Sequence, residues 1–221
     1  MARLKDEKRR TLSSRTWLER QISDPYVIRA KREGLRSRAA YKLAEIDDKY
    51  RVFKQGARVV DLGAAPGGWS EIAAQRVDAK EKNKGRVIAL DILDMKPIPG
   101  VEFLHLDFLD PSAPDRLKAM LGGKADIVLS DMAANTTGHR QTDHLRIMAL
   151  AEAAAMFARE VLADGGVLIC KVLQGGTETK LLAELKRNFE SVKHVKPPAS
   201  RSDSAELYLL ARGFRRRNVE A

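Results

Sequence analysis

Short apolar runs alternate with helix-like segments along most of the chain, and this alternation constrains the fold more than any other feature. Six runs follow one another from residue 56 onward, and they read ARVVDL, GRVIALD, VEFLHLD, ADIVLSD, GGVLICKV and ELYLLAR. Helix-forming residues fill the segments between them, so we expect helices at 68–77, 111–121, 142–162 and 178–188. Strands and helices that alternate at this spacing build βαβ units. We therefore predict an α/β fold with a mainly parallel sheet that helices cover on both faces.

The part of the chain before the first run is strongly basic. Residues 1–55 hold 16 Lys and Arg against 8 Asp and Glu, so they contribute +8 of the net charge of +10. Two helices are expected here, at Pro25–Glu33 after a capping Asp24 and at Ser37–Tyr50. A polyanion such as nucleic acid is the simplest partner for this region, and a solvated basic surface is the alternative. The predicted organisation is a basic N-terminal arm at 1–55, a main domain at 56–213 and a basic tail at 214–221.

Three features of the sequence indicate the cellular compartment: the first residues, the length of the apolar runs and the single cysteine. The first residues, MARLKDEKRRTLSSR, mix acids with bases and lack the apolar stretch of a secretory signal. No apolar run approaches the roughly 18 residues that cross a bilayer. Cys170 is the only cysteine, so the chain has no internal disulfide, and its apolar surroundings predict a buried side chain. We expect a cytoplasmic monomer with no membrane contact.

Four of the apolar runs end in an aspartate, and one leads into a glycine-rich turn, VVDLGAAPGGWS at 59–70. The carboxyl ends of parallel strands meet at one edge of a sheet, where open α/β folds bind ligands. Several acids at that edge require a polar or cationic ligand, although capping of the following helices explains one or two of them equally well. The four acids are Asp61, Asp91, Asp107 and Asp131.

Two ligands compete for the glycine-rich turn. A dinucleotide favours the pattern G-x-G-x-x-G, but the turn reads GAAPGG from Gly63 to Gly68, so the second glycine is an alanine. Nearby acids also repel a pyrophosphate. S-adenosylmethionine carries a sulfonium, an ammonium, ribose hydroxyls and an adenine amine, and carboxylates suit all four groups. Asp91 lies 28 residues after Gly63, where it can accept from the ribose hydroxyls. The residues therefore favour S-adenosylmethionine.

These stretches together resemble the FtsJ/RrmJ family of ribosomal RNA 2′-O-methyltransferases. The resemblance extends from about Asp24 to Gly213 and rests on five segments, GLRSRAAYKL (34–43), VVDLGAAPGGWS (59–70), SDMAANTTG (130–138), KVLQG (171–175) and ELYLLARG (206–213). It implies a Rossmann-like S-adenosylmethionine-dependent methyltransferase fold over 56–213 and an RNA-binding role for the arm at 1–55. It also implies a catalytic tetrad and a set of cofactor contacts. The tetrad falls on Lys42, Asp131, Lys171 and Glu206, and the cofactor contacts fall on Gly67, Trp69, Asp91, Asp107 and Asp131.

A ribose 2′-hydroxyl attacks a methyl group well only when its proton is withdrawn. We expect Lys171 to accept that proton, with Asp131 and Glu206 orienting it and Lys42 positioning the ribose and its phosphate. Partial burial and a neighbouring ammonium would lower the pKa of Lys171, and the two carboxylates would oppose that shift. No metal is expected, because the four histidines show no ligand spacing.

The resemblance implies a uridine of large-subunit (23S) ribosomal RNA as the substrate, within an assembling ribosomal subunit. Within the arm, Arg32, Arg36 and Arg38 are the expected RNA contacts. Three alternatives remain open: a 2′-O-methyltransferase of tRNA or of an RNA cap, an RNA-binding assembly factor with a vestigial cofactor site, and a dinucleotide oxidoreductase. The complete tetrad argues against the second alternative, and the interrupted glycine pattern argues against the third.

Overall fold

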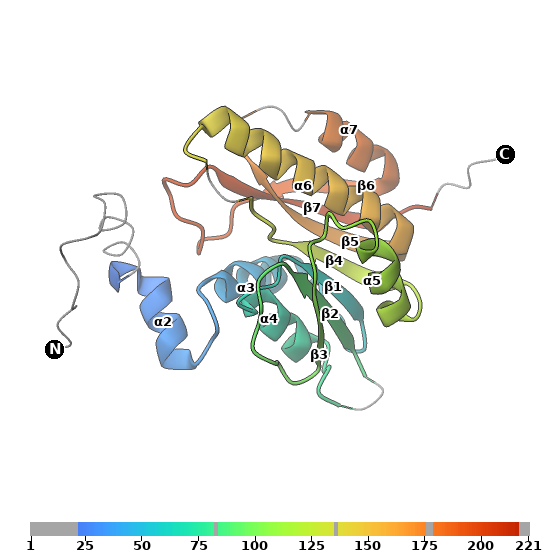
Figure 1. Cartoon of the computed structure of the whole chain (residues 1–221), viewed down its shortest axis with the longest axis horizontal. Coiled ribbons are helices and arrows are strands. Elements are labelled where there is room, and N and C mark those ends of the chain that lie inside the picture. The colour runs from blue at the N-terminus through green and yellow to red at the C-terminus, as the bar shows by residue number, and fades with distance from the viewer. Residues whose placement is uncertain (1–21, 82–83, 135–136, 176–178, 217–221) are drawn as a thin grey trace.

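A seven-stranded sheet forms the centre of the computed structural model, which describes residues 22–81, 84–134, 137–175 and 179–216 (Figure 1). The strand order is β3-β2-β1-β4-β5-β7-β6. The strands are β1 (Arg58–Leu62), β2 (Arg86–Asp91), β3 (Val101–His105), β4 (Ala125–Ser130), β5 (Leu162–Leu173), β6 (Phe189–Val195) and β7 (Glu206–Phe214). Strands β1 to β5 pair in parallel, and β7 runs antiparallel to both β5 and β6. The predicted mainly parallel sheet is confirmed.

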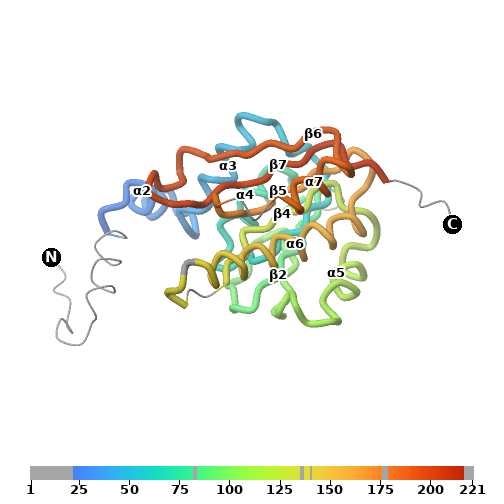
Figure 2. Tube along the Cα trace, turned by 90° about the horizontal axis from the view of Figure 1, so that it is seen from above, coloured from blue at the N-terminus to red at the C-terminus, as the bar shows by residue number. Residues whose placement is uncertain are grey.

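Helices cover the sheet on both faces, as the alternation predicts. The helices are α2 (Pro25–Glu33), α3 (Ala39–Tyr50), α4 (Gly68–Arg76), α5 (Ala113–Leu121), α6 (Arg140–Val161) and α7 (Thr179–Asn188). Apolar side chains of α3 and α4 pack on one face, and those of α5, α6 and α7 pack on the other. Figure 2 shows α3 and α6 on opposite sides of the strands. Among the described residues, no helix combines the length and the apolar character that crossing a membrane requires.

One strand was not expected from the sequence. Strand β6 lies at the edge of the sheet beside β7, and only its two end residues, Phe189 and Val195, are buried. An edge strand with so few buried positions has no continuous apolar run, so its sequence, FESVKHV, carries a weak strand signal. Residues 1–21 of the predicted arm and 217–221 of the predicted tail lie outside the described residues.

Helix α3, which lies in the predicted basic arm, packs into the core of the main domain. Ala40, Leu43 and Ile46 are at most 1% exposed, and they join the cluster that contains Val59 of β1 and Ile127 of β4. Their spacing of three residues puts them on one face of the helix, which is the face turned to the sheet. The hydrophobic core therefore extends across residue 55 into the basic segment.

Asp47 fixes the chain where it leaves α3 for the sheet. Its Oδ1 atom accepts hydrogen bonds from the backbone N–H groups of Val52 (2.8 Å) and Phe53 (3.0 Å). Its Oδ2 atom forms an ion pair with Arg76 of α4 at 3.0 Å, and the residue is 5% exposed. One carboxylate thus satisfies two backbone donors and joins two helices.

We expect the substitution Asp47→Ala to lower the free energy of unfolding by about 3 kcal/mol, because it leaves two backbone donors without their partner. The control is Asp48→Ala, which removes a carboxylate that pairs with the same Arg76 at 2.7 Å but is 64% exposed. That change should cost less than about 1 kcal/mol. Denaturant unfolding of both variants measures the difference, and equal losses would contradict this role of Asp47.

Candidate active site

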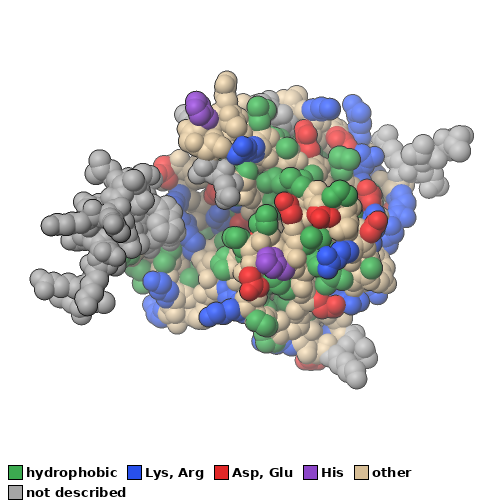
Figure 3. All heavy atoms as spheres, viewed as in Figure 1, with side chains coloured by type: hydrophobic (Ala, Val, Ile, Leu, Met, Phe, Trp, Pro, Cys, Tyr) green, Lys and Arg blue, Asp and Glu red, His purple; other side chains and the backbone are tan. Residues whose placement is uncertain are grey.

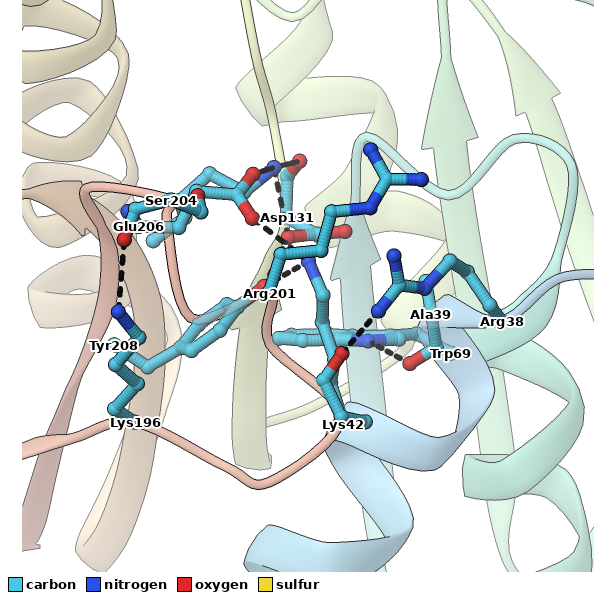
Figure 4. A network of polar contacts seen from close by, with 12 residues as sticks. Arg38, Ala39, Lys42, Trp69, Asp131, Lys196, Arg201, Ser204, Glu206 and Tyr208 are labelled. Atoms are coloured by element: carbon cyan, nitrogen blue, oxygen red, sulfur yellow. Dashed lines mark hydrogen bonds and ion pairs between the residues drawn. The ribbon is translucent and has the colours of Figure 1, made fainter. Parts of the chain in front are cut away.

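The predicted tetrad comes together at the carboxyl edge of the sheet, from four separate elements. Asp131 directly follows β4, Lys171 lies in the last part of β5, and Glu206 is the first residue of β7. Because β7 is antiparallel to β5, its beginning lies beside the end of β5, with Leu173 opposite Glu206. Lys42 reaches the same place from α3 (Figure 4).

Lys171 has three acceptors around its ammonium group. Its Nζ atom lies 2.8 Å from Asp131 Oδ1, 2.9 Å from the main-chain oxygen of Asp131 and 3.6 Å from Glu206 Oε1. The side chain is 6% exposed. Three acceptors match the three hydrogens of an ammonium, so the geometry suits the protonated lysine.

Lys42 contacts the second oxygen of the Glu206 carboxylate, whose first oxygen lies near Lys171. Its Nζ atom donates to Glu206 Oε2 at 3.1 Å and to the hydroxyl of Tyr208 at 3.1 Å. Glu206 therefore pairs with both lysines, through a hydrogen bond from Lys42 to one oxygen and an ion pair between Lys171 and the other. The four tetrad side chains form one continuous polar network.

The carboxylates control how these groups titrate. Burial lowers the pKa of Lys171, but the charges of Asp131 and Glu206 raise it by more, so the net direction is upward. Burial raises the pKa of Glu206, and Lys42 and Lys171 more than offset that, so its net direction is downward. Burial and the two carboxylates thus shift the pKa of Lys171 in the two opposing directions that the sequence analysis expected, and the carboxylates outweigh burial.

Tyr208 is a member of this network that the sequence analysis missed. Its hydroxyl donates to Asp131 Oδ1 at 2.8 Å while it accepts from Lys42. The signal that could have found it is the strand periodicity, because residues two apart on β7 share one side of the sheet and Tyr208 follows Glu206 by two. A buried tyrosine on that side is positioned to meet the same polar groups.

A pocket of about 410 Å³ opens in front of the network. Arg38 and Arg201 line it together with Lys42 and Glu206. Both guanidinium groups are held by Asp24, and Arg38 also donates to the main-chain oxygen of Ala199. Cationic groups that are fixed in this way form a rigid, positively charged wall next to the two lysines.

The glycine-rich turn lies beside the network, between β1 and α4. Gly63 has φ +77°, and a Cβ there would lie 2.7 Å from the Met132 side chain and 2.8 Å from its Cα. Gly67 has φ +108°, and its Cβ would lie within 2.9 Å of Ile98, Arg36 and Met95. Only glycine fits either position, so the turn passes close to the segment after Asp131.

Asp91 and Asp107, two more residues that we expect to contact the cofactor, differ in how deeply their side chains are buried. Asp91 is buried, and its two oxygens accept from the N–H groups of Ala65 and Leu93, each at 2.8 Å. Asp107 is exposed after β3 and accepts from Leu109 N at 2.9 Å. These two side chains follow neighbouring strands at the same edge as Asp131.

Trp69 has a buried side chain that is directed to the network and to α3. It is 2% exposed, its indole N–H donates to the main-chain oxygen of Ala39 at 2.9 Å, and its ring centroid lies 5.4 Å from that of Tyr208. The indole ring therefore packs against the ring of Tyr208.

Asp61, which the sequence grouped with the other strand-end acids, is the most deeply buried of the four. It is fully buried, and Ser70 Oγ donates to its Oδ2 atom at 2.6 Å. Burial raises the pKa of this carboxyl to about 7. The end of a strand in the sequence does not reveal whether its last side chain lies inside the core.

Two of the three arginines expected to bind RNA are engaged within the protein. Arg36 donates to the main-chain oxygens of Lys96 and Pro97, and Arg38 is held by Asp24. The side chain of Arg32 is 77% exposed and lies 3.8 Å from Glu33. Figure 3 shows basic side chains mostly toward the margins of the visible face, with apolar and acidic ones between them.

The histidines are not gathered at the network. In the part of the chain that the structure describes, no group of three or more His, Cys, Asp and Glu side chains could hold a metal ion. Cys170 is buried next to Lys171, and burial raises the pKa of its thiol to about 12. Two lysines, two carboxylates and a tyrosine are the titratable groups that the structure brings into contact at this edge of the sheet.

Comparisons with known proteins agree with this geometry. A family model described as FtsJ-like methyltransferase matches residues 35–214. The chain is 65% identical over 207 residues to a protein of Rhodopseudomonas palustris (strain TIE-1) named ribosomal RNA large subunit methyltransferase E, covering 94% of this chain and 87% of that protein. A protein of Afipia carboxidovorans with the same name is 66% identical over 207 residues, covering 94% and 92% of the two chains.

A solved structure shares both sequence and fold. The crystal structure described as a ribosomal RNA methyltransferase from Plasmodium falciparum superposes with a TM-score of 0.71 at 32% identity, covering 81% of this chain and 98% of that one. A structure from Clostridium thermocellum, at 18% identity and a TM-score of 0.53, supports the fold alone. With a family match over most of its length and relatives that are this similar, the chain belongs to the FtsJ-like methyltransferase family.

Proposed function

We propose that this protein transfers a methyl group from S-adenosylmethionine to the ribose 2′-hydroxyl of a uridine in large-subunit ribosomal RNA, on an assembling subunit. The observation that carries the proposal is the closed network of Lys42, Asp131, Lys171 and Glu206 next to the glycine-rich turn. The names of the similar proteins support RNA of the large ribosomal subunit as the substrate.

The acids at the sheet edge fit S-adenosylmethionine. Strand β1 separates β2 from β4, so Asp91 and Asp131 follow strands that are about 10 Å apart, a span that suits a nucleoside with a cationic side arm. Each oxygen of Asp91 accepts one backbone hydrogen bond and keeps capacity for a ribose hydroxyl. The indole N–H of Trp69 donates to the main-chain oxygen of Ala39. We therefore assign the cofactor contacts of Trp69 and Gly67 to their backbone groups, where α4 begins.

Three exposed apolar side chains support an adenine site next to these acids. Ile92, Leu93 and Leu109 are 61%, 65% and 63% exposed, and they follow Asp91 and Asp107 closely in the chain. Large apolar side chains beside carboxylates match the faces of a purine ring and its exocyclic amine. We therefore place the adenine near Asp107 and the ribose hydroxyls near Asp91.

When bound, S-adenosylmethionine supplies the methyl group on a positively charged sulfur. The residues of the chain orient the ribose hydroxyl and receive its proton. Glu206 Oε1 is the most distant of the three acceptors around Lys171, at 3.6 Å, so it is the one that a ribose oxygen replaces. Lys171 Nζ then contacts the 2′-oxygen and, having first released one proton to solvent, takes the hydroxyl proton as the 2′-oxygen forms its bond to the methyl carbon. Asp131 keeps the amine directed at that oxygen.

Lys42 and the two arginines that line the pocket carry the positive charges that would bind the phosphate of the nucleotide. Lys42 lies on the pocket side of Glu206, and Arg38 and Arg201 form the adjacent wall. Fixed guanidinium groups bind a phosphate at little entropic cost. Exposed basic residues between 22 and 55, such as Lys31 and Arg32, extend this positive surface toward neighbouring nucleotides, in keeping with the charge of +8 that the sequence 1–55 carries.

Methylation of RNAs extracted from cells tests the proposed substrate. We expect the protein and methyl-labelled S-adenosylmethionine to label one uridine ribose in large ribosomal subunits from a strain that lacks the gene, and to leave tRNA and small subunits unlabelled. Nuclease mapping and mass spectrometry locate the methyl group. Label in tRNA would support the alternative substrate, and binding of subunits without any methyl transfer would support an assembly factor.

The substitution Lys171→Arg tests the proton acceptor. Arginine keeps the positive charge, but its pKa above about 12 prevents it from accepting a proton at neutral pH. We expect single-turnover methyl transfer to slow about a hundredfold or more, the usual size of a general-base contribution, with cofactor and RNA affinity unchanged.

The matched control for this test is Lys193→Arg, which makes the same exchange at an exposed position of β6 away from the network. It should retain the parent rate. A Lys171→Arg enzyme within about threefold of the parent rate would assign Lys171 the role of a fixed positive charge.

A further inference from the structure

A single buried hydroxyl joins two parts of the active-site network. Tyr208 is 0% exposed and lies directly opposite Lys171 in the pairing of β5 with β7. Its hydroxyl accepts from Lys42 Nζ at 3.1 Å and donates to Asp131 Oδ1 at 2.8 Å. It thus links the lysine that comes from α3 to the carboxylate that follows β4.

The direction of these hydrogen bonds is fixed. Burial and the charge of Asp131 hold the pKa of Tyr208 well above its usual range, so the phenol keeps its proton and donates it to the carboxylate. Asp131 Oδ1 therefore accepts from Tyr208 and from Lys171, which lie on two adjacent strands. Two donors at different positions hold the carboxylate in one orientation.

The tyrosine ring is itself held in place by Trp69. The two ring centroids are 5.4 Å apart at an interplanar angle of 40°, and the indole N–H is bonded to Ala39, three residues before Lys42 (Figure 4). Lys42 Nζ also lies 5.6 Å from the centroid of the Tyr208 ring. The ring is enclosed between Trp69 and the helix that carries Lys42.

We propose that Tyr208, supported by Trp69, is a positioning residue of the methyl-transfer site, and that its hydroxyl holds Lys42 and Asp131 in the arrangement that receives the ribose. The reaction named here rests on the proposed function. The positioning is a property of the free protein, because every contact in it lies within the chain.

Tyr208→Phe removes one oxygen and keeps the ring, so it tests the proposal with little change in packing. In a crystal structure of the variant we expect Lys42 Nζ or the Asp131 carboxylate to move by more than about 0.5 Å, the tolerance of a productive site. Single-turnover methyl transfer should slow at least about tenfold, while the affinity for S-adenosylhomocysteine stays within about twofold. The rate–pH profile should shift to higher pH, because Asp131 then shares its charge with Lys171 alone.

Tyr41→Phe provides the stability reference. Tyr41 is 6% exposed, and its hydroxyl donates to Glu33 Oε2 at 2.7 Å, so this change also removes a phenol hydroxyl that is bound to a carboxylate. Both variants should lower the melting temperature by similar amounts. A larger loss of stability in Tyr208→Phe, with an unshifted pH profile, would make Tyr208 a packing residue.

Two further results would overturn the proposal: a variant structure in which both groups keep their places, or a parent-like rate constant. The proposed function is tested separately, because it fails if the parent protein transfers no methyl group to any RNA. In that case the crystal structure of Tyr208→Phe still decides whether the hydroxyl positions Lys42 and Asp131.

Discussion

The ion pair between Lys171 and Asp131 is the interaction on which the site depends. An ammonium that is 6% exposed is tolerated only with close partners, because its burial costs several kcal/mol. Asp131 provides two of them, a carboxylate oxygen and its own main-chain oxygen. Both are within reach because β4 and β5 are parallel neighbours in a register that sets Ser130 opposite Cys170. The sheet order is therefore part of the chemistry as well as of the fold.

The reversed direction of β7 completes the arrangement. A parallel strand at this place would bring its last residues to the ligand edge, whereas antiparallel β7 brings its first ones, Glu206 and Tyr208. Lys42 then meets Glu206 across 164 residues of sequence, from a helix on one face of the sheet. Since both lysines contact Glu206, the network joins helix α3 to β7, the last strand that the structure describes.

The sequence predicted the periodic features well and the depth of burial poorly. The alternation of runs predicted the sheet and its helices, and the resemblance predicted Lys42 and Glu206, which charge and spacing alone leave open. The sequence did not reveal that Asp61 is fully buried, because a period-two pattern reports a side of the strand and says nothing of depth. The hydrogen bond from Arg36 to Pro97 was not expected, because nothing local in the sequence reveals a partner 61 residues away. Tyr208 was missed because a tyrosine in an apolar strand is ordinary until its hydroxyl has partners.

The pH dependence of single-turnover methyl transfer tests most directly whether Lys171 receives the proton. Asp131 and Glu206 raise the pKa of Lys171, so the free protein at neutral pH holds mostly the ammonium form. The neutral fraction grows about tenfold per pH unit below the pKa. With RNA and S-adenosylmethionine saturating, the rate constant should therefore rise with a slope near one, on logarithmic axes, from about pH 6 to the pKa of Lys171 in the complex. A flat profile over that range would contradict the account, because the proton would then pass to a carboxylate or to water.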